Sequence, residues 1–155
     1  MERGGERREA AVEILKRNGD YSLRALLVLG RLADGEIMAA DRLARSAKVA
    51  EPILRKLLQK MAGAGVVEST RGAGGGFRLA RAPRDISVLE VIEPVQGKLA
   101  INRCFLAASH CPLKGRCAIS RKLVGIQEHL VQFFKGITLA DLLAEEPVPA
   151  GKASE

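Results

Sequence analysis

All three cysteines of the 155-residue chain lie within one stretch of fourteen residues. They follow the spacing Cys-x6-Cys-x5-Cys, at Cys104, Cys111 and Cys117, with Pro112 and Gly115 between the last two. The stretch comes after a basic half that is rich in glycine and before a long segment with apolar periodicity. The sequence therefore predicts a loop of soft ligands that separates two helical parts.

The spacing of the cysteines narrows the choice of metal. Thiolates suit zinc, copper(I) and iron–sulfur clusters. Structural zinc takes four ligands, usually in pairs spaced by roughly two to four residues, whereas the gaps here are six and five residues and no fourth cysteine exists. A cluster held by three cysteines and one other group fits better. We therefore expect an iron–sulfur cluster, 2Fe-2S or 4Fe-4S, at Cys104, Cys111 and Cys117.

Other roles for the three thiols stay open at this point. The alternatives are three separate structural thiols, a disulfide with one spare thiol, a zinc site, or a thiol redox switch. Disulfides belong mostly to oxidising compartments, and the charged N-terminus has no apolar core that would act as a secretory signal. No apolar run approaches the roughly 18 residues that a membrane span requires. We expect a soluble, cytoplasmic protein with reduced thiols.

Enzyme chemistry finds little support in the sequence. A catalytic cysteine would need a base nearby, and His110 and His129 are the only histidines. The glycine run at 72–76 leads into a predicted strand, not a helix, and lacks a Walker lysine, so it does not predict a nucleotide-binding loop. We therefore expect a binding protein and not an enzyme.

The positive charge is concentrated in one segment. Between Arg42 and Arg81 there are nine basic and two acidic residues, while the remaining sixteen basic and sixteen acidic residues cancel. The formal net charge of +7 thus lies in this segment, as expected of a surface that neutralises phosphates. Aromatic residues make up only 3% of the chain, so the stacking platforms of single-strand and RNA readers are missing. Duplex DNA is the favoured partner, and a basic face without a partner is the alternative.

Residues 14–96 are expected to form a winged helix-turn-helix, after a flexible extension over residues 1–13. Apolar residues recur at helical spacing from Tyr21 to Ala33, where a turn signal ends the run. A second helix is expected over 40–47, and a third begins with Pro52 in its first turn, where proline costs little. The apolar stripe of this third helix is predicted to be Ile53, Leu54, Leu57, Leu58 and Met61. Two short helices joined by a tight turn fit a helix-turn-helix, in which the second helix is the recognition helix.

The candidate DNA contacts lie on that third helix and on the hairpin after it. Strands are expected over 66–70 and 77–80, joined by a glycine-rich tip that can pass close to another backbone. Such a wing can set an arginine into a narrow minor groove, and arginine on a recognition helix can read guanine or bind phosphate. Ordinary exposed charge on an amphipathic helix is the alternative. The predicted DNA-binding residues are Arg55, Lys56, Lys60, Arg71, Gly74 and Arg78.

The C-terminal part is expected to hold the dimer contact. Ser87 and Glu90 form a capping-box pattern, which predicts a helix over 87–95 that places the cysteine loop, residues 97–118, beside the DNA-reading part. Residues 119–146 are assigned to a dimerisation helix and a short last helix, and residues 147–155 to a disordered tail. The gaps of four, three, four and three residues are typical of a coiled-coil seam, which comprises Ile119, Leu123, Ile126, Leu130 and Phe133. Core packing within one chain is the alternative.

Four stretches, in this order, carry a resemblance to a known family. They are the run from Asp20 to Leu27, the run from Gly65 to Ala80, Cys-Pro-Leu-Lys-Gly-Arg-Cys at 111–117, and Ile-Thr-Leu-Ala-Asp-Leu-Leu at 137–143. With them, the chain resembles the IscR/NsrR/RirA-type (Rrf-type) family of bacterial winged-helix repressors from about Ile14 to Leu143.

The resemblance implies a homodimer that binds a roughly palindromic operator and holds an iron–sulfur cluster through three cysteines, matched here by Cys104, Cys111 and Cys117. Family members sense cluster supply, iron, nitric oxide or redox state, and some lack the cysteines and sense otherwise. The expected fold is mainly α with a small β-hairpin wing and a long C-terminal dimerisation helix. The expected function is that of a transcriptional regulator, as a repressor.

The fourth ligand of the cluster differs between branches of the family, and this chain lacks the one that the cluster-assembly branch uses. In the cluster-assembly branch a histidine three residues beyond the third cysteine completes the site, and that position here is Ser120. In the nitric-oxide-sensing branch an aspartate from the first helix of the partner subunit serves, and Asp20 stands at the matching place. Asp20 is the leading candidate, with helix capping as its alternative role, and His110 is the second. The first cysteine gap is also one residue longer than in those branches.

Overall fold

The first predicted helix lies at the centre of the fold. In the computed structural model, which describes residues 12–106 and 111–145, α1 covers Arg17–Gly30. It begins earlier than Tyr21, and it ends at Gly30 because Leu32 already bonds back to Leu29 with the tighter geometry of a helix end. The predicted extension to Ala33 is therefore wrong. Helix α1 contacts α2 (Ala40–Ala47), α3 (Glu51–Gly63), α4 (Val88–Gln96) and α6 (Leu139–Glu145).

Helices α2 and α3 form the predicted pair, and Pro52 stands in the first turn of α3. The buried stripe of α3 consists of Leu54, Leu57, Leu58 and Met61. Ile53 does not belong to it, because 42% of its surface is exposed. Successive side chains on a helix are about 100° apart, so with Leu54 buried Ile53 faces outward. The prediction that Ile53 is a core residue is wrong.

The wing is an antiparallel hairpin of β1 (Val67–Thr70) and β2 (Gly76–Leu79), within a residue of the predicted strands. Strand β2 also pairs with the link between α1 and α2, since Phe77 and Met38 exchange N–H to carbonyl bonds of 2.9 and 3.0 Å. A Cβ on Gly76 would lie 2.3 Å from the Met38 carbonyl oxygen, so only glycine permits this approach. The hairpin is thereby fixed to the helical part.

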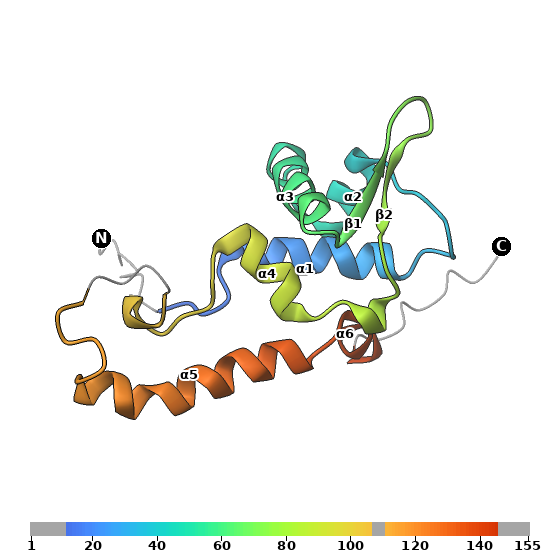
Figure 1. Cartoon of the computed structure of the whole chain (residues 1–155). Helices are drawn as coiled ribbons and strands as arrows, with labels where there is room; N and C mark the ends of the chain where they lie inside the picture. Colours follow the sequence, from blue (N-terminus) through green and yellow to red (C-terminus); the bar gives the residue numbers. More distant parts are fainter. Residues whose placement is uncertain (1–11, 107–110, 146–155) are drawn as a thin grey trace, which may run out of the picture.

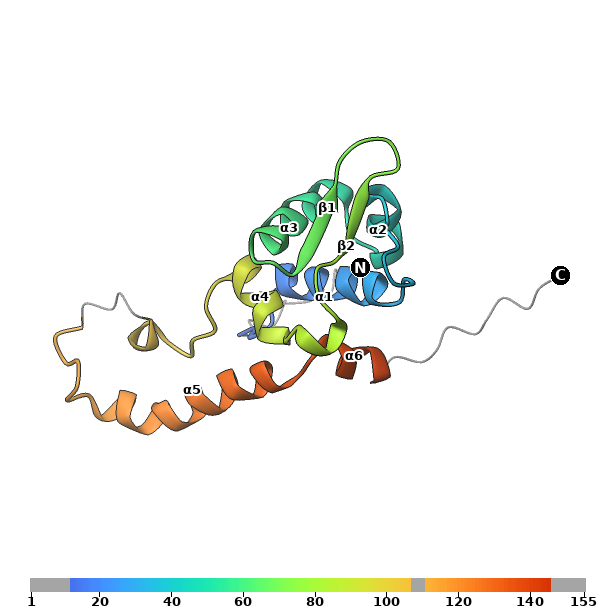
Figure 2. The same cartoon turned by 45° about the vertical axis from the view of Figure 1, so that its right-hand side comes forward.

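Helix α4 lies between α1 and the long helix α5 (Ala118–Gly136), as both views show (Figures 1 and 2). The predicted capping box is confirmed, because the N–H of Glu90 bonds to the Ser87 hydroxyl and the Glu90 carboxylate accepts from the N–H of Ser87. Two short 3-10 helices, η1 (Pro83–Asp85) and η2 (Arg103–Phe105), lie on either side of α4 in the chain.

The chain returns to the start of α4 after α5 ends at Gly136. Val88 donates to the carbonyl of Ile137 and Leu139 to that of Ile86, both at 2.8 Å. Thr138 and Asp141 cap α6 as predicted. Within the described residues, no helix is long and apolar enough to cross a membrane. The predicted disordered tail and nearly all of the predicted N-terminal extension lie outside the described residues.

Candidate nucleic-acid interface and metal site

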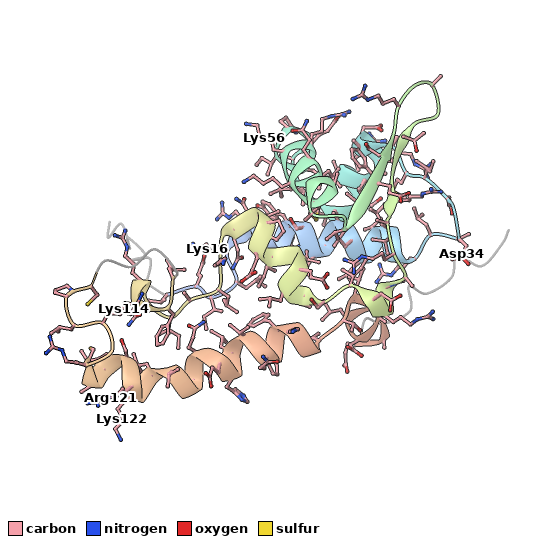
Figure 3. The ribbon with its side chains drawn as sticks, viewed as in Figure 1. Lys16, Asp34, Lys56, Lys114, Arg121 and Lys122 are labelled. Carbon is pink, nitrogen blue, oxygen red and sulfur yellow. The ribbon has the colours of Figure 1, made fainter. Side chains whose placement is uncertain are left out.

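Three predicted DNA-binding residues lie on the outer side of α3. The buried stripe of this helix faces the core, so Arg55, Lys56 and Lys60 are exposed. Figure 3 shows Lys56 on the side of α3 that points away from α1. The amphipathic pattern thus separates an apolar inner face from a basic outer one.

The hairpin presents the other three predicted residues. Arg71 and Gly74 are exposed at the tip, and Arg78 is exposed on β2. The tip turns sharply because Gly74 has a φ of 76° and Gly75 donates to the Gly72 carbonyl at 3.0 Å. A Cβ on Gly75 would lie 2.3 Å from the Thr70 carbonyl oxygen. These glycines leave the tip free of bulky side chains next to Arg71.

Two of the six predicted DNA-binding residues form ion pairs with acidic residues of the chain itself. Arg55 lies 2.7 Å from Glu51 one helical turn earlier, and Arg78 lies 2.9 Å from Glu68, its cross-strand neighbour. Both pairs are on the surface, where an ion pair contributes only about 0–1 kcal/mol. The carboxylates therefore orient the two guanidinium groups without preventing an exchange for phosphate.

Sequence reasoning missed Ile53 as a surface residue of α3. It is exposed on the same side of α3 as Lys56, three residues later, although apolar residues in such a place usually face the core. The sequence pattern did not separate it from the core residues, because Ile53, Leu54, Leu57, Leu58 and Met61 together form one continuous apolar arc on the helix. An outward isoleucine on a recognition helix can contact the methyl group of thymine.

The three cysteines lie in a short helix, in a turn and at the start of α5. Cys104 belongs to η2, where its N–H bonds to the Asn102 side chain at 2.9 Å. Cys111 begins a turn in which Lys114 donates to its carbonyl at 3.1 Å, and Cys117 is the N-cap residue of α5. All three are free thiols, with Cys104 exposed and the other two half-buried. No disulfide joins any two of them, so the disulfide alternative is not supported.

The position of Cys117 favours its thiolate. The pKa of the Cys117 thiol is lowered, first by the backbone N–H of Ser120 and then by that of Ile119, both in the first turn of α5. Arg121 adds a smaller attraction. A thiol at a helix N-terminus is ionised to a greater extent at neutral pH, and the thiolate is the form that binds metal.

Basic side chains surround the cysteine loop. From Lys98 to Gln127 the sequence has six basic residues and no acidic one. Figure 3 places Lys114, Arg121 and Lys122 together at the end of the molecule that carries this loop. Positive charge favours thiolates and any group of net negative charge bound by them. The concentration of charge at 42–81 concealed this second cluster, which a count over 98–127 would have found.

The single chain does not bring the predicted ligands together. Within the described residues, no three His, Cys, Asp or Glu side chains lie close enough to hold one metal ion. Asp20 lies inside α1 and pairs with Arg24 at 2.7 Å, and Lys16 is the N-cap of that helix, so the capping role for Asp20 is wrong. His110 lies outside the described residues.

The cysteine loop also lies elsewhere than expected. It leads into the end of α5 that is remote from the hairpin (Figure 1), so the prediction that it lies beside the DNA-reading part is wrong. Helix α4 separates the two parts instead. The free thiols, the helix N-terminus and the basic surroundings nonetheless have the chemistry that an iron–sulfur cluster requires of its ligands.

Comparison with known proteins decides the family. A family model described as "Rrf2: Iron-dependent Transcriptional regulator" matches residues 15–145. The chain belongs to the Rrf2 family. Among curated Rrf2-like relatives, the regulator NsrR of Geobacillus kaustophilus is 32% identical over 127 residues, which are 81% of this chain and 86% of that protein. The repressor NsrR of Streptomyces coelicolor is 31% identical and covers 84% and 88% of the two chains.

Solved structures agree with the Rrf2 assignment. IscR from T. potens aligns with a TM-score of 0.65 at 26% identity and covers 90% of this chain and 93% of its own. CymR of B. subtilis aligns with a TM-score of 0.70 and covers 90% and 100%, and at 20% identity it supports the fold alone. The predicted family and the winged-helix fold are confirmed. This Rrf2 protein is a DNA-binding transcriptional regulator and not an enzyme.

Proposed function

We propose that this Rrf2 protein is a dimeric repressor that senses iron, redox state or nitric oxide through an iron–sulfur cluster on its cysteine loop. One observation carries the proposal. A DNA-reading fold and a loop of three free thiols in basic surroundings lie at opposite ends of the molecule, with α4 between them (Figure 1). Residues 14–96 form the DNA-binding unit, 97–118 the cysteine loop and 119–146 the dimerisation part.

In this proposal α3 enters the major groove and the hairpin follows the minor groove. Lys56 and Lys60 are exposed on the outer face of α3, and Arg55 joins them once it leaves Glu51. Arg71 binds phosphate or the minor groove from the tip, where Gly74 allows close approach, and Arg78 exchanges Glu68 for phosphate. Duplex DNA is the partner because the surface offers positive charge without aromatic stacking platforms.

The cluster ligands in this proposal are Cys104, Cys111 and Cys117, with Asp20 of the partner subunit as the fourth. When bound, the cluster supplies a redox-active centre that responds to iron supply or nitric oxide. The three thiolates would join η2 to the N-cap of α5 and so close the loop between them. Without the cluster, Cys104, Cys111 and Cys117 would no longer hold the segment that precedes α5, on the far side of α4 from the DNA-reading helix.

The dimer contact is proposed on α5. Ile119, Ile126 and Phe133 stand seven residues apart, and 65%, 58% and 56% of their surfaces are exposed. Leu123 and Leu130, the other two seam positions, are half-buried at the edge of the face that packs on the chain itself. Core packing thus leaves one apolar stripe of α5 uncovered, as a helix that pairs with its twin requires.

The DNA-binding part is tested on duplexes selected from a random pool by protein purified without oxygen. Arg71→Ala should weaken binding to every selected duplex and reduce the slope of log affinity against log salt by about one, as the loss of one phosphate contact does. Lys135→Ala, an exposed lysine on α5, is the matched control and should bind as the wild type does. Duplex binding that does not depend on salt, or the absence of duplex binding, would contradict the proposed DNA-binding function.

The sensing part is tested by affinity before and after removal of the cluster with a chelator. We expect the affinity for the selected operator to change by about fivefold or more, within the usual range of coupling between sites. A second candidate function, a thiol redox switch, is favoured by the lowered pKa of Cys117. That switch would bind no metal, and its operator affinity would change on oxidation in protein free of iron.

A further inference from the structure

Lys48 has an unusual backbone in the turn between α2 and α3. Its φ of 56° and ψ of 47° are left-handed, and it is the one non-glycine residue with positive φ among those that the structure describes. The turn is a helix end in which Lys48 donates toward Arg45 and Val49 donates to the Ala44 carbonyl at 3.0 Å. Glycine or asparagine is the usual residue at such a position.

The lysine at this place calls for an explanation outside the turn. A left-handed conformation is unfavourable for residues with a Cβ, and glycine would adopt it without strain. Strained residues of this kind cluster at functional sites, where the surroundings hold them in place. The Lys48 side chain itself is exposed, so packing does not account for it.

A hollow of about 190 Å³ opens beside Lys48. Its polar lining comes from Arg24 and Arg31 of α1 and its end, from Ser46 of α2 and from Lys48, and no described residue that lines it is acidic. The Arg24 guanidinium is oriented by the Asp20 carboxylate at 2.7 Å and lies 5.7 Å from the centre of the Tyr21 ring. Cationic and hydroxyl donors from two helices and their turn thus surround one space.

We propose that this hollow is a phosphate-binding site, in which Lys48, Arg24, Arg31 and Ser46 hold the anion by charge-assisted hydrogen bonds. Its volume exceeds that of several water molecules at roughly 30 Å³ each, so it admits a tetrahedral phosphate. Lys48, at its rim, lies in the turn that leads into α3, where a DNA backbone phosphate would flank the bases that the helix reads. A free phosphate compound is the other source, and only the DNA source rests on the proposed function.

The test compares the wild type with Lys48→Gly and Lys48→Asn, both of which suit the left-handed position. Thermal unfolding should show Lys48→Gly melting about 2–6 °C higher, because the strain is relieved. For a DNA phosphate, both variants should bind every duplex about three- to tenfold more weakly, with a salt slope smaller by about one. Lys135→Ala, at an exposed lysine of α5 away from the cysteine loop, should change neither quantity.

Inorganic phosphate and pyrophosphate form the second arm. If the source is a free phosphate, these anions should raise the melting temperature of the wild type and not that of Lys48→Gly, while DNA binding stays equal. If both variants match the wild type in salt slope and in the change of melting temperature with either anion, the hollow is not a phosphate-binding site. If Lys48→Gly binds DNA normally while Arg71→Ala binds weakly, the DNA source fails and the proposed function stands. If the wild type binds no duplex, the phosphate site is tested only by whether inorganic phosphate and pyrophosphate raise the melting temperature of the wild type and not that of Lys48→Gly.

Discussion

Gln127 holds Leu99 against α5. Its side-chain N–H donates to the Leu99 carbonyl at 2.9 Å, and its side-chain oxygen accepts from the N–H of Ile101 at 2.8 Å. Gln127 is the one buried residue of α5, although the helix has many apolar residues. The amide thus fixes the segment that leads to Cys104. The same segment is also attached to α4, because the N–H of Leu99 donates to the Glu93 carboxylate at 3.2 Å.

Replacing Gln127 with Leu should destabilise the fold by about 1–3 kcal/mol, because two backbone groups lose their partners. Chemical denaturation at neutral pH measures the difference. Gln132→Leu is the matched control, since Gln132 is an exposed glutamine on the same helix and its replacement should cost less than about 0.5 kcal/mol. Equal stability of the two variants would show that the Gln127 contacts contribute nothing.

Ile126→Glu should convert the proposed dimer to a monomer. The side chain lies in the exposed stripe of α5, where a symmetric dimer would bring two new carboxylates into an apolar contact. Analytical ultracentrifugation over a range of protein concentrations measures the change. We expect the dissociation constant to rise by at least about tenfold.

The control for that experiment lies on the same helix. Val124 is also exposed, with 42% of its surface accessible, but it stands about 160° around α5 from Ile126. Val124→Glu introduces the same charge and should remain dimeric. If both variants dissociate, or neither does, the stripe of Ile119, Ile126 and Phe133 is not the dimer contact.

Glu90 should make the fold sensitive to acid. The pKa of Glu90 is lowered from its usual 4.5, first by the N–H of Ser87 in the capping box and also by Arg81. Because the folded state lowers this pKa, the stabilisation is present above pH 4.5 and is lost as the pH falls through the folded value. Glu90→Gln should therefore melt below the wild type at neutral pH, and the difference should shrink below pH 4.5.

Melting temperatures measured from pH 7 downward check this sign. Glu128→Gln, at an exposed carboxylate of α5, serves as the control for the loss of one negative charge. A difference between wild type and Glu90→Gln that stays constant through the acidic range would show that the capping carboxylate does not titrate with unfolding.

Sequence reasoning predicted most of the fold because local signals were strong. The capping box at Ser87 and the glycine tip of the wing depend on neighbours a few residues away, and both occur as predicted. The error at Ile53 arose because five apolar residues on α3 span a wider arc than the core covers. A sequence pattern does not reveal which edge of such an arc faces outward.

The site was less predictable because it depends on distant contacts and on backbone angles. The attachment of Leu99 to Gln127 joins residues that are 28 apart in the chain, and no periodic pattern marks it. The left-handed angle of Lys48 follows from how α2 ends, and the type of residue there does not suggest it. The three cysteines were evident at once, but their distance from the hairpin follows from the packing of α4 between α1 and α5.

The central claim is that Cys104, Cys111 and Cys117 hold an iron–sulfur cluster. The most direct measurement is the absorbance spectrum of protein purified without oxygen, with iron, sulfide and zinc contents from the same sample. We predict a brown protein with a broad violet-blue band and matched iron and sulfide, and a colourless Cys111→Ala variant that folds and associates as the wild type does. Colourless wild-type protein that cannot be reconstituted with iron and sulfide would contradict the claim.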